Sequence, residues 1–149
     1  MELNFGKFQD NGRSGYVLKP RYLRENAPAP KPRVLKIKFI SAQQLPKPDQ
    51  SLKGEIIDPF VEFEVFGADG VKKIKTKTIQ DNGFNPVWDE EFEFLVSDPE
   101  LTLLRFVVMD EDLNAHDFIA SNAFPLNCLA PGTVFCFLFL FCFVFLRFC

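Results

Sequence analysis

Hydrophobic and polar residues alternate along much of the chain, and the period of the alternation is two. In the segment VLKIKFI (34–40), three apolar side chains fall on one side of an extended chain and two lysines fall on the other. The segment FVEFEVF (60–66) alternates in the same way, with glutamates opposite the apolar side chains. This pattern is typical of a β-strand with one buried and one exposed face. Further segments continue it: KKIKTKTI (72–79), VWDEEFEFLV (87–96), LTLLRFVVM (101–109) and, more weakly, FIASNAFPL (118–126).

Turn-forming residues separate the predicted strands, in clusters at 67–70, 81–86 and 97–99. No stretch between them repeats apolar residues at the helical spacing of about 3.6 residues. Short strands joined by turns, without intervening helices, predict an all-β protein with the architecture of an antiparallel β-sandwich. The aromatic residues expected in its core are Phe63, Trp88, Phe92, Phe94 and Phe106.

The two ends of the chain depart from this pattern. The first 20 residues are rich in glycine and hold too few apolar residues for a core, and RENAPAPKP (24–32) has the composition of a stiff linker. The last 17 residues, TVFCFLFLFCFVFLRFC, carry a single charge. We therefore expect four parts: residues 1–22, a Pro-rich linker at 23–32, the sandwich at 33–132 and an apolar tail at 133–149.

The apolar tail admits two interpretations. Phe, Leu, Val and Cys all have thymine-rich codons, which favours translated intron or wrong-frame sequence, and this is the interpretation we prefer. The alternative is a membrane anchor, although the uncharged run at 134–146 is shorter than the roughly 18–20 residues that a spanning helix needs.

Composition narrows the classes of function. The 149 residues hold 17 Lys and Arg against 20 Asp and Glu, a formal net charge of -3, so no overall basic excess favours nucleic acid. The first ten residues lack the apolar stretch of a secretory signal, which indicates a cytosolic start. Three of the four cysteines lie in the tail, and their spacing fits neither a metal site nor a disulfide framework.

Acidic residues gather between the predicted strands. One aspartate stands directly before the strand at 60–66, one lies in the preceding connection, and three follow the strand at 101–109. A carboxylate cluster is costly unless a cation neutralises it, and Ca²⁺ suits such a cluster because it accepts about six to eight oxygen ligands. The alternative is that these are ordinary solvated loop acids. The candidate ligands are Asp49, Asp58, Asp110, Asp112 and Asp117.

Lysines form a second candidate surface. Lys73, Lys75 and Lys77 occupy alternate positions of one predicted strand and therefore share a face, and Lys72 is adjacent. Such a stripe can contact the phosphates of anionic lipid, each charge contributing about 1 kcal/mol. The alternative is a solvated face that guards a strand edge from pairing. The single histidine, His116, has no partner in a catalytic motif.

Four segments resemble successive blocks of a C2 domain: IIDPFVEFEV, NGFNPVWDEEFEF, LRFVVMDED and HDFIA. Together with DNGRSGYVLKP (10–20), they are similar to phosphoinositide-specific phospholipase C of the delta kind, in which the end of a catalytic barrel precedes a linker and the C2 domain. The resemblance covers residues 1 to about 132, so residues 1–22 would be the end of that barrel. A complete C2 sandwich has two more strands than we predict here. We therefore expect that the last two strands are missing and that the chain is unstable by itself.

The resemblance also implies a calcium site. Asp112 and Asp117 are one residue closer than usual, Asp49 is placed by loop alignment alone, and Ala120 stands where glycine is common, and such loop changes would weaken calcium binding. The implied ligands are Asp58, Asp110 and Asp112, with Asp49, Asp117 and, as in the delta kind, Asn82.

The implied function is calcium-dependent binding to anionic phospholipid membranes, by a module that orients the catalytic barrel of a parent enzyme. That enzyme would hydrolyse phosphatidylinositol 4,5-bisphosphate to diacylglycerol and inositol trisphosphate in intracellular signalling. The catalytic residues of the barrel find no match in residues 1–22, so this chain is expected to be inactive. The expected location is cytoplasmic and peripheral at the membrane; the alternative is a tail-anchored, non-catalytic membrane protein.

Overall fold

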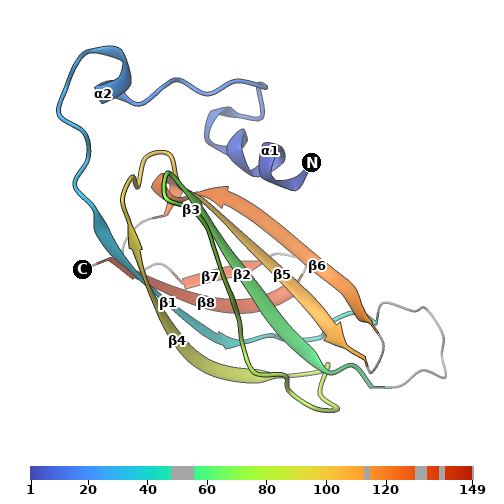
Figure 1. Cartoon of the computed structure of the whole chain (residues 1–149). Helices are drawn as coiled ribbons and strands as arrows, with labels where there is room; N and C mark the ends of the chain where they lie inside the picture. Colours follow the sequence, from blue (N-terminus) through green and yellow to red (C-terminus); the bar gives the residue numbers. More distant parts are fainter. Residues whose placement is uncertain (48–55, 113–114, 130–133, 138–139, 149) are drawn as a thin grey trace.

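Two antiparallel β-sheets form the body of the molecule (Figure 1). The structure is a computed structural model, and it describes residues 1–47, 56–112, 115–129, 134–137 and 140–148. The strands are β1 (Arg33–Ser41), β2 (Pro59–Gly67), β3 (Gly70–Lys75), β4 (Val87–Val96), β5 (Leu103–Glu111), β6 (His116–Pro125), β7 (Val134–Phe137) and β8 (Leu140–Phe148). One sheet has the order β4-β1-β8-β7 and the other β3-β2-β5-β6. The prediction of an all-β antiparallel sandwich is confirmed.

Alternate residues of both sheets meet in the core. Phe39 of β1 contacts Phe63 of β2 and Phe106 of β5, with ring centroids 5.7 and 5.9 Å apart. Trp88 is fully buried, and its Nε1 donates a hydrogen bond to the carbonyl of Pro59 at 3.3 Å, so its polar group keeps a partner. The expected aromatic core is therefore present, except that Phe92 is only partly buried.

The third strand is shorter than the alternation predicted. Its regular pairing with β2 ends at Lys75, and the next residue, Thr76, bonds to β2 through both its side chain and its backbone. The N–H of Val61 donates to Thr76 Oγ1 at 2.9 Å, and the N–H of Thr76 donates to the carbonyl of Val61 at 3.0 Å. A hydroxyl that satisfies a backbone group in this way competes with regular strand pairing. Lys77 consequently lies beyond the end of β3.

The expectation that the last two strands are missing is wrong. Residues of the apolar tail form β7 and β8, and β8 pairs with β1 from Leu35 opposite Phe148 to Ser41 opposite Phe143. β1 is therefore an interior strand, paired on both sides. The unpaired strand edges that were the reason to expect instability are absent at β1. Alternation could not predict these strands, because in a segment that is almost entirely apolar no polar side chains show which face is exposed. Among the described residues, no helix is long and apolar enough to cross a membrane.

Short helices precede the sandwich: α1 (Glu2–Lys7), η1 (Gln9–Asn11) and α2 (Arg21–Arg24). The first two of them contact β6. Gly6 of α1 is buried, and a Cβ at this position would overlap the backbone of Ala123 in β6, so the close approach requires glycine. The hydroxyl of Tyr22 donates to Asp98 in the β4–β5 turn, and this hydrogen bond raises the pKa of Tyr22 to about 12. The segment before the sandwich is thus attached to it through both α1 and Tyr22.

Arg105 of β5 links this segment to the sheet. Its Nε donates to Glu2 Oε2 and its Nη1 to Glu64 Oε2, both at 2.8 Å. We expect Arg105→Met to lower the free energy of unfolding by about 1 kcal/mol, because the pairs are partly exposed, and to speed amide exchange in α1. Urea titration and hydrogen exchange measure the two effects. Arg33→Met removes an exposed arginine outside these pairs, and an equal effect of both substitutions would contradict the prediction.

Candidate functional site

Two of the predicted calcium ligands meet at one end of the sheet β3-β2-β5-β6. Pro59, the first residue of β2, pairs with Asp110 near the end of β5, which brings Asp58 beside it. The N–H of Asp58 donates to Asp110 Oδ1 at 2.6 Å, and the N–H of Glu111 donates to the carbonyl of Asp58 at 3.1 Å. The side chain of one candidate ligand is therefore held by the backbone of the other.

Two further predicted ligands lie in the connection from β5 to β6. Asp117 is opposite Asp110 in the pairing of these strands. Asp112 follows β5, and its N–H donates to the carbonyl of Ala115 at 3.1 Å. Both side chains are exposed. Asp58, Asp110, Asp112 and Asp117 thus lie at the same end of this sheet, while Asp49 lies outside the described residues.

The pKa of Asp110 reflects the electrostatic surroundings at this end of the sandwich. Its side chain is 7% exposed, and this burial is the largest cause of a pKa raised above the usual value. The carboxylates of Asp112, Asp58 and Asp117 raise the pKa further, in that order, against the hydrogen bond from the backbone of Asp58. The negative charges are therefore poorly compensated, which favours cation binding.

The donor set suits Ca²⁺, because every candidate supplies oxygen and calcium takes flexible oxygen coordination. The candidate ligands are nevertheless not closely grouped. Among the residues that the structure describes, no three His, Cys, Asp or Glu side chains are close enough together to hold a metal ion.

The loop between β3 and β4 adds a contact that the prediction did not include. Asn82, the predicted ligand in this loop, accepts the N–H of Asn85 on its Oδ1 at 3.0 Å. Its neighbour Asp81 contacts the site through its backbone, since its N–H donates to Asp58 Oδ1 at 2.6 Å. Sequence reasoning missed Asp81 because the contact uses a backbone group, which every residue except proline has.

Exposed apolar side chains flank the acidic residues, and sequence reasoning missed them as well. Ile56, Phe84 and Phe118 are 52%, 70% and 54% exposed. Each lies within two residues of a predicted ligand in the sequence, and this proximity could have identified it as part of the same surface. Exposed apolar residues beside a charged site are a feature of surfaces that contact a membrane or a partner.

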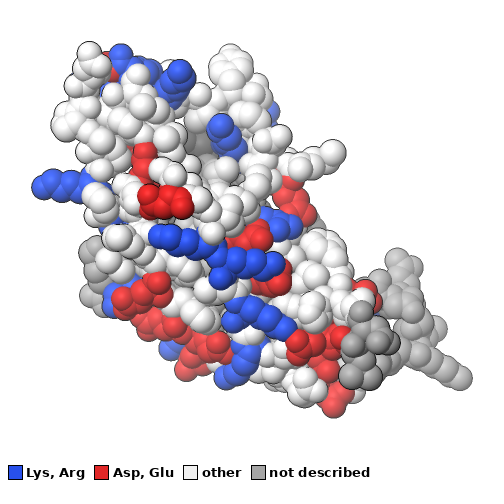
Figure 2. All heavy atoms as spheres, in the orientation of Figure 1, with Lys and Arg blue, Asp and Glu red and all other residues white. Residues whose placement is uncertain are grey.

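Lys73 and Lys75 of β3 are exposed, and both are paired with glutamates, whereas Lys72 is half-buried. Lys73 Nζ lies 2.7 Å from Glu62 and 3.8 Å from Glu64 on β2. Lys75 pairs with Glu111 and also lies 3.7 Å from the ring centroid of Phe60. On the face drawn in Figure 2, basic and acidic side chains are interspersed and form no separate basic patch.

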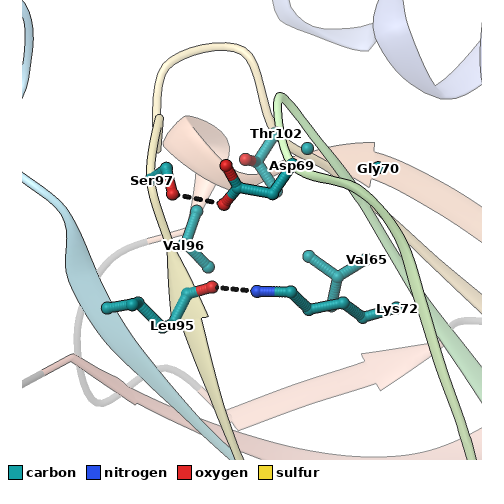
Figure 3. A pocket seen from close by; sticks show the side chains of 9 residues that line it. Val65, Asp69, Gly70, Lys72, Leu95, Val96, Ser97 and Thr102 are labelled. Atoms are coloured by element: carbon teal, nitrogen blue, oxygen red, sulfur yellow. Dashed lines mark hydrogen bonds between the residues drawn. The ribbon is translucent and has the colours of Figure 1, made fainter.

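Lys72 lines a small pocket at the opposite end of β2 (Figure 3). Its Nζ donates to the carbonyl of Leu95 at 2.6 Å, and the hydroxyl of Ser97 donates to Asp69 across the same pocket. These bonds join β3 and the β2–β3 turn to β4 and the residue that follows it. The polar groups are therefore used to close the side of the sandwich, and they form no nucleophile–base pair.

The described residues thus form an antiparallel sandwich of two four-stranded sheets with acidic residues at one end. The chain belongs to the C2 domain family, whose model matches residues 33–139. This match extends into the Phe-rich tail.

Comparison with curated proteins confirms the resemblance to phospholipase C. The chain is 42% identical over 146 residues to human inactive phospholipase C-like protein 2, covering 89% of this chain and 13% of that protein. It is 43% identical over 145 residues to human 1-phosphatidylinositol 4,5-bisphosphate phosphodiesterase eta-1, covering 89% and 9%. The chain therefore spans a small part of these relatives.

A solved structure supports the fold. The calcium-bound pair of C2 domains from extended synaptotagmin 2 matches with a TM-score of 0.63 and 28% identity, over 82% of this chain and 47% of that one.

Proposed function

We propose that this chain is a module that binds anionic phospholipid membranes when calcium occupies its acidic loops. One observation carries the proposal: Asp110 is buried beside three other carboxylates whose charges raise its pKa. A buried carboxylate in such surroundings gains from a cation that neutralises the group. The family match and the calcium-bound neighbour support the choice of cation.

Asp58, Asp110 and Asp112 would hold the ion, with Asn82 and Asp117 as further ligands. The resemblance adds Asp49, which lies outside the described residues. Bound calcium supplies positive charge and open coordination positions for lipid phosphate. The N–H of Asp58 keeps Asp110 oriented. The exposed side chains of Ile56, Phe84 and Phe118 enter the membrane interface, where they add apolar contact area.

The basic strand has a secondary role in this proposal. Lys72, Lys73, Lys75 and Lys77 add attraction to anionic lipid of at most about 1 kcal/mol each. Lys73 and Lys75 contribute less than this, because glutamates already neutralise part of their charge.

In a longer parent protein, residues 1–22 would close a catalytic barrel and residues 23–32 would link it to the module. The module would orient that barrel at the membrane, where the parent hydrolyses phosphatidylinositol 4,5-bisphosphate to diacylglycerol and inositol trisphosphate. The proposed location is cytoplasmic and peripheral at the membrane. The alternative of a tail anchor is disfavoured because the described tail residues pair as strands.

Sedimentation with vesicles of phosphatidylserine and phosphatidylcholine tests the proposal. The chain is expected to pellet with calcium and to stay in solution with chelator, and Asp110→Asn with Asp112→Asn is expected to abolish pelleting. Asp89→Asn with Glu91→Gln is the matched control, because it removes the same charge from exposed positions of β4. Pelleting that ignores chelator and these aspartates, and that resists high salt, would instead identify a membrane anchor.

A further inference from the structure

We infer that Asp81 is a positioning residue of the calcium site and acts through its backbone N–H rather than its carboxylate. This inference rests on the proposed function. The N–H of Asp81 donates to Asp58 Oδ1 at 2.6 Å, and the N–H of Asp58 donates in turn to Asp110 Oδ1, also at 2.6 Å. A chain of two hydrogen bonds thus runs from the β3–β4 loop to the buried carboxylate at the end of β5.

The backbone conformation of Asp81 aims this N–H. Its φ is +51°, in the left-handed region that glycine, asparagine and aspartate tolerate and β-branched residues avoid. The direction of an N–H bond follows from the backbone angles. A residue that leaves the left-handed region therefore turns this donor away from Asp58.

Close packing fixes the loop that carries Asp81. A Cβ on Gly83 would overlap the side chain of Ile57, which is 4% exposed and adjoins Asp58. In addition, the N–H of Leu45 donates to the carbonyl of Gly83 at 2.9 Å. These two contacts hold the loop in place, and with it the N–H of Asp81 beside Asp58.

The consequence is a carboxylate that is oriented in advance. An ionised carboxylate has about four lone-pair sites, so one hydrogen bond orients Asp58 and leaves acceptor capacity for a cation. A ligand held in this way loses less conformational freedom on binding, which strengthens the affinity of the site. The side chain of Asp81 is not needed for this effect.

Calorimetric titration of the full chain with CaCl₂ tests this inference through variants at one position. Asp81→Val disfavours the left-handed conformation, and we expect it to weaken calcium binding about tenfold, as the loss of a hydrogen bond to a charged group does. Asp81→Gly and Asp81→Asn keep the conformation, and we expect them to bind within about twofold of the original chain. Melting in chelator checks that each variant folds. If Asp81→Val does not fold, Asp81→Ala takes its place, with a smaller loss in the same direction.

The outcomes separate this inference from the function on which it rests. Equal binding by all variants would overturn it, and so would a loss in Asp81→Gly and Asp81→Asn as large as that in Asp81→Val, because the carboxylate would then be the active group. In both cases the original chain still binds calcium and the proposed function stands. Absence of calcium binding by the original chain would overturn both.

Discussion

Calcium is expected to raise the melting temperature of this chain by roughly 5–10 °C when present at about one hundred times its dissociation constant. Asp110→Asn should abolish this shift and should itself melt higher than the original chain in chelator. The reason is that burial and the neighbouring carboxylates raise the pKa of Asp110, so its ionised form is less favourable in the folded state. Asparagine removes the charge and keeps an oxygen to accept the N–H of Asp58.

The sign of this effect depends on pH. A carboxyl whose pKa is higher in the folded than in the unfolded state costs stability when both states are ionised. The cost begins to shrink as the pH falls through the folded pKa and is gone below the unfolded pKa. In chelator, the advantage of Asp110→Asn over the original chain should therefore be full at neutral pH and shrink on acidification. Differential scanning calorimetry over this range measures it.

Asp89→Asn is the control for the calcium and pH effects. Asp89 is exposed and pairs with Lys38, so its loss should leave the calcium shift unchanged. An Asp110→Asn variant that melts lower than the original chain in chelator, or that keeps the calcium shift, would contradict the account.

Removal of residues 130–149 should abolish cooperative unfolding. The truncation takes away β8, which pairs with β1 from Leu35 to Ser41, and leaves an interior strand with unpaired backbone groups. Each lost backbone hydrogen bond costs about 1 kcal/mol, and the whole ladder costs a large share of a typical stability of roughly 5–15 kcal/mol. Urea titration followed by circular dichroism, with light scattering to detect aggregation, measures the effect.

Deletion of residues 1–12 provides the comparison. It removes α1 and η1 and the contacts of Glu2 and Gly6, but both sheets keep all their strands. This variant should unfold in one cooperative transition at a lower denaturant concentration. A truncated chain without residues 130–149 that melts as cooperatively as the full chain would show that the tail is dispensable.

The alternation of side chains was sufficient to locate most of the fold. Apolar residues at every second position can be buried together only if the segment is extended, so β1, β2 and β4 lie where the pattern placed them. The same reasoning identified Trp88 and Phe63 as core residues. It also placed Asp58 and Asp110 at strand ends, because each stands where an alternating segment stops.

Local periodicity in the sequence was therefore enough to predict the fold class, the faces of the strands and the strand ends at which Asp58 and Asp110 stand. Which strands are neighbours follows only from the folded chain. That arrangement pairs the tail with β1, sets Lys73 beside Glu62, and brings the N–H of Asp81 to Asp58. Register between distant segments depends on the packing of the whole sandwich. The identity of a residue does not show which group its backbone N–H bonds to, because every residue except proline has this donor.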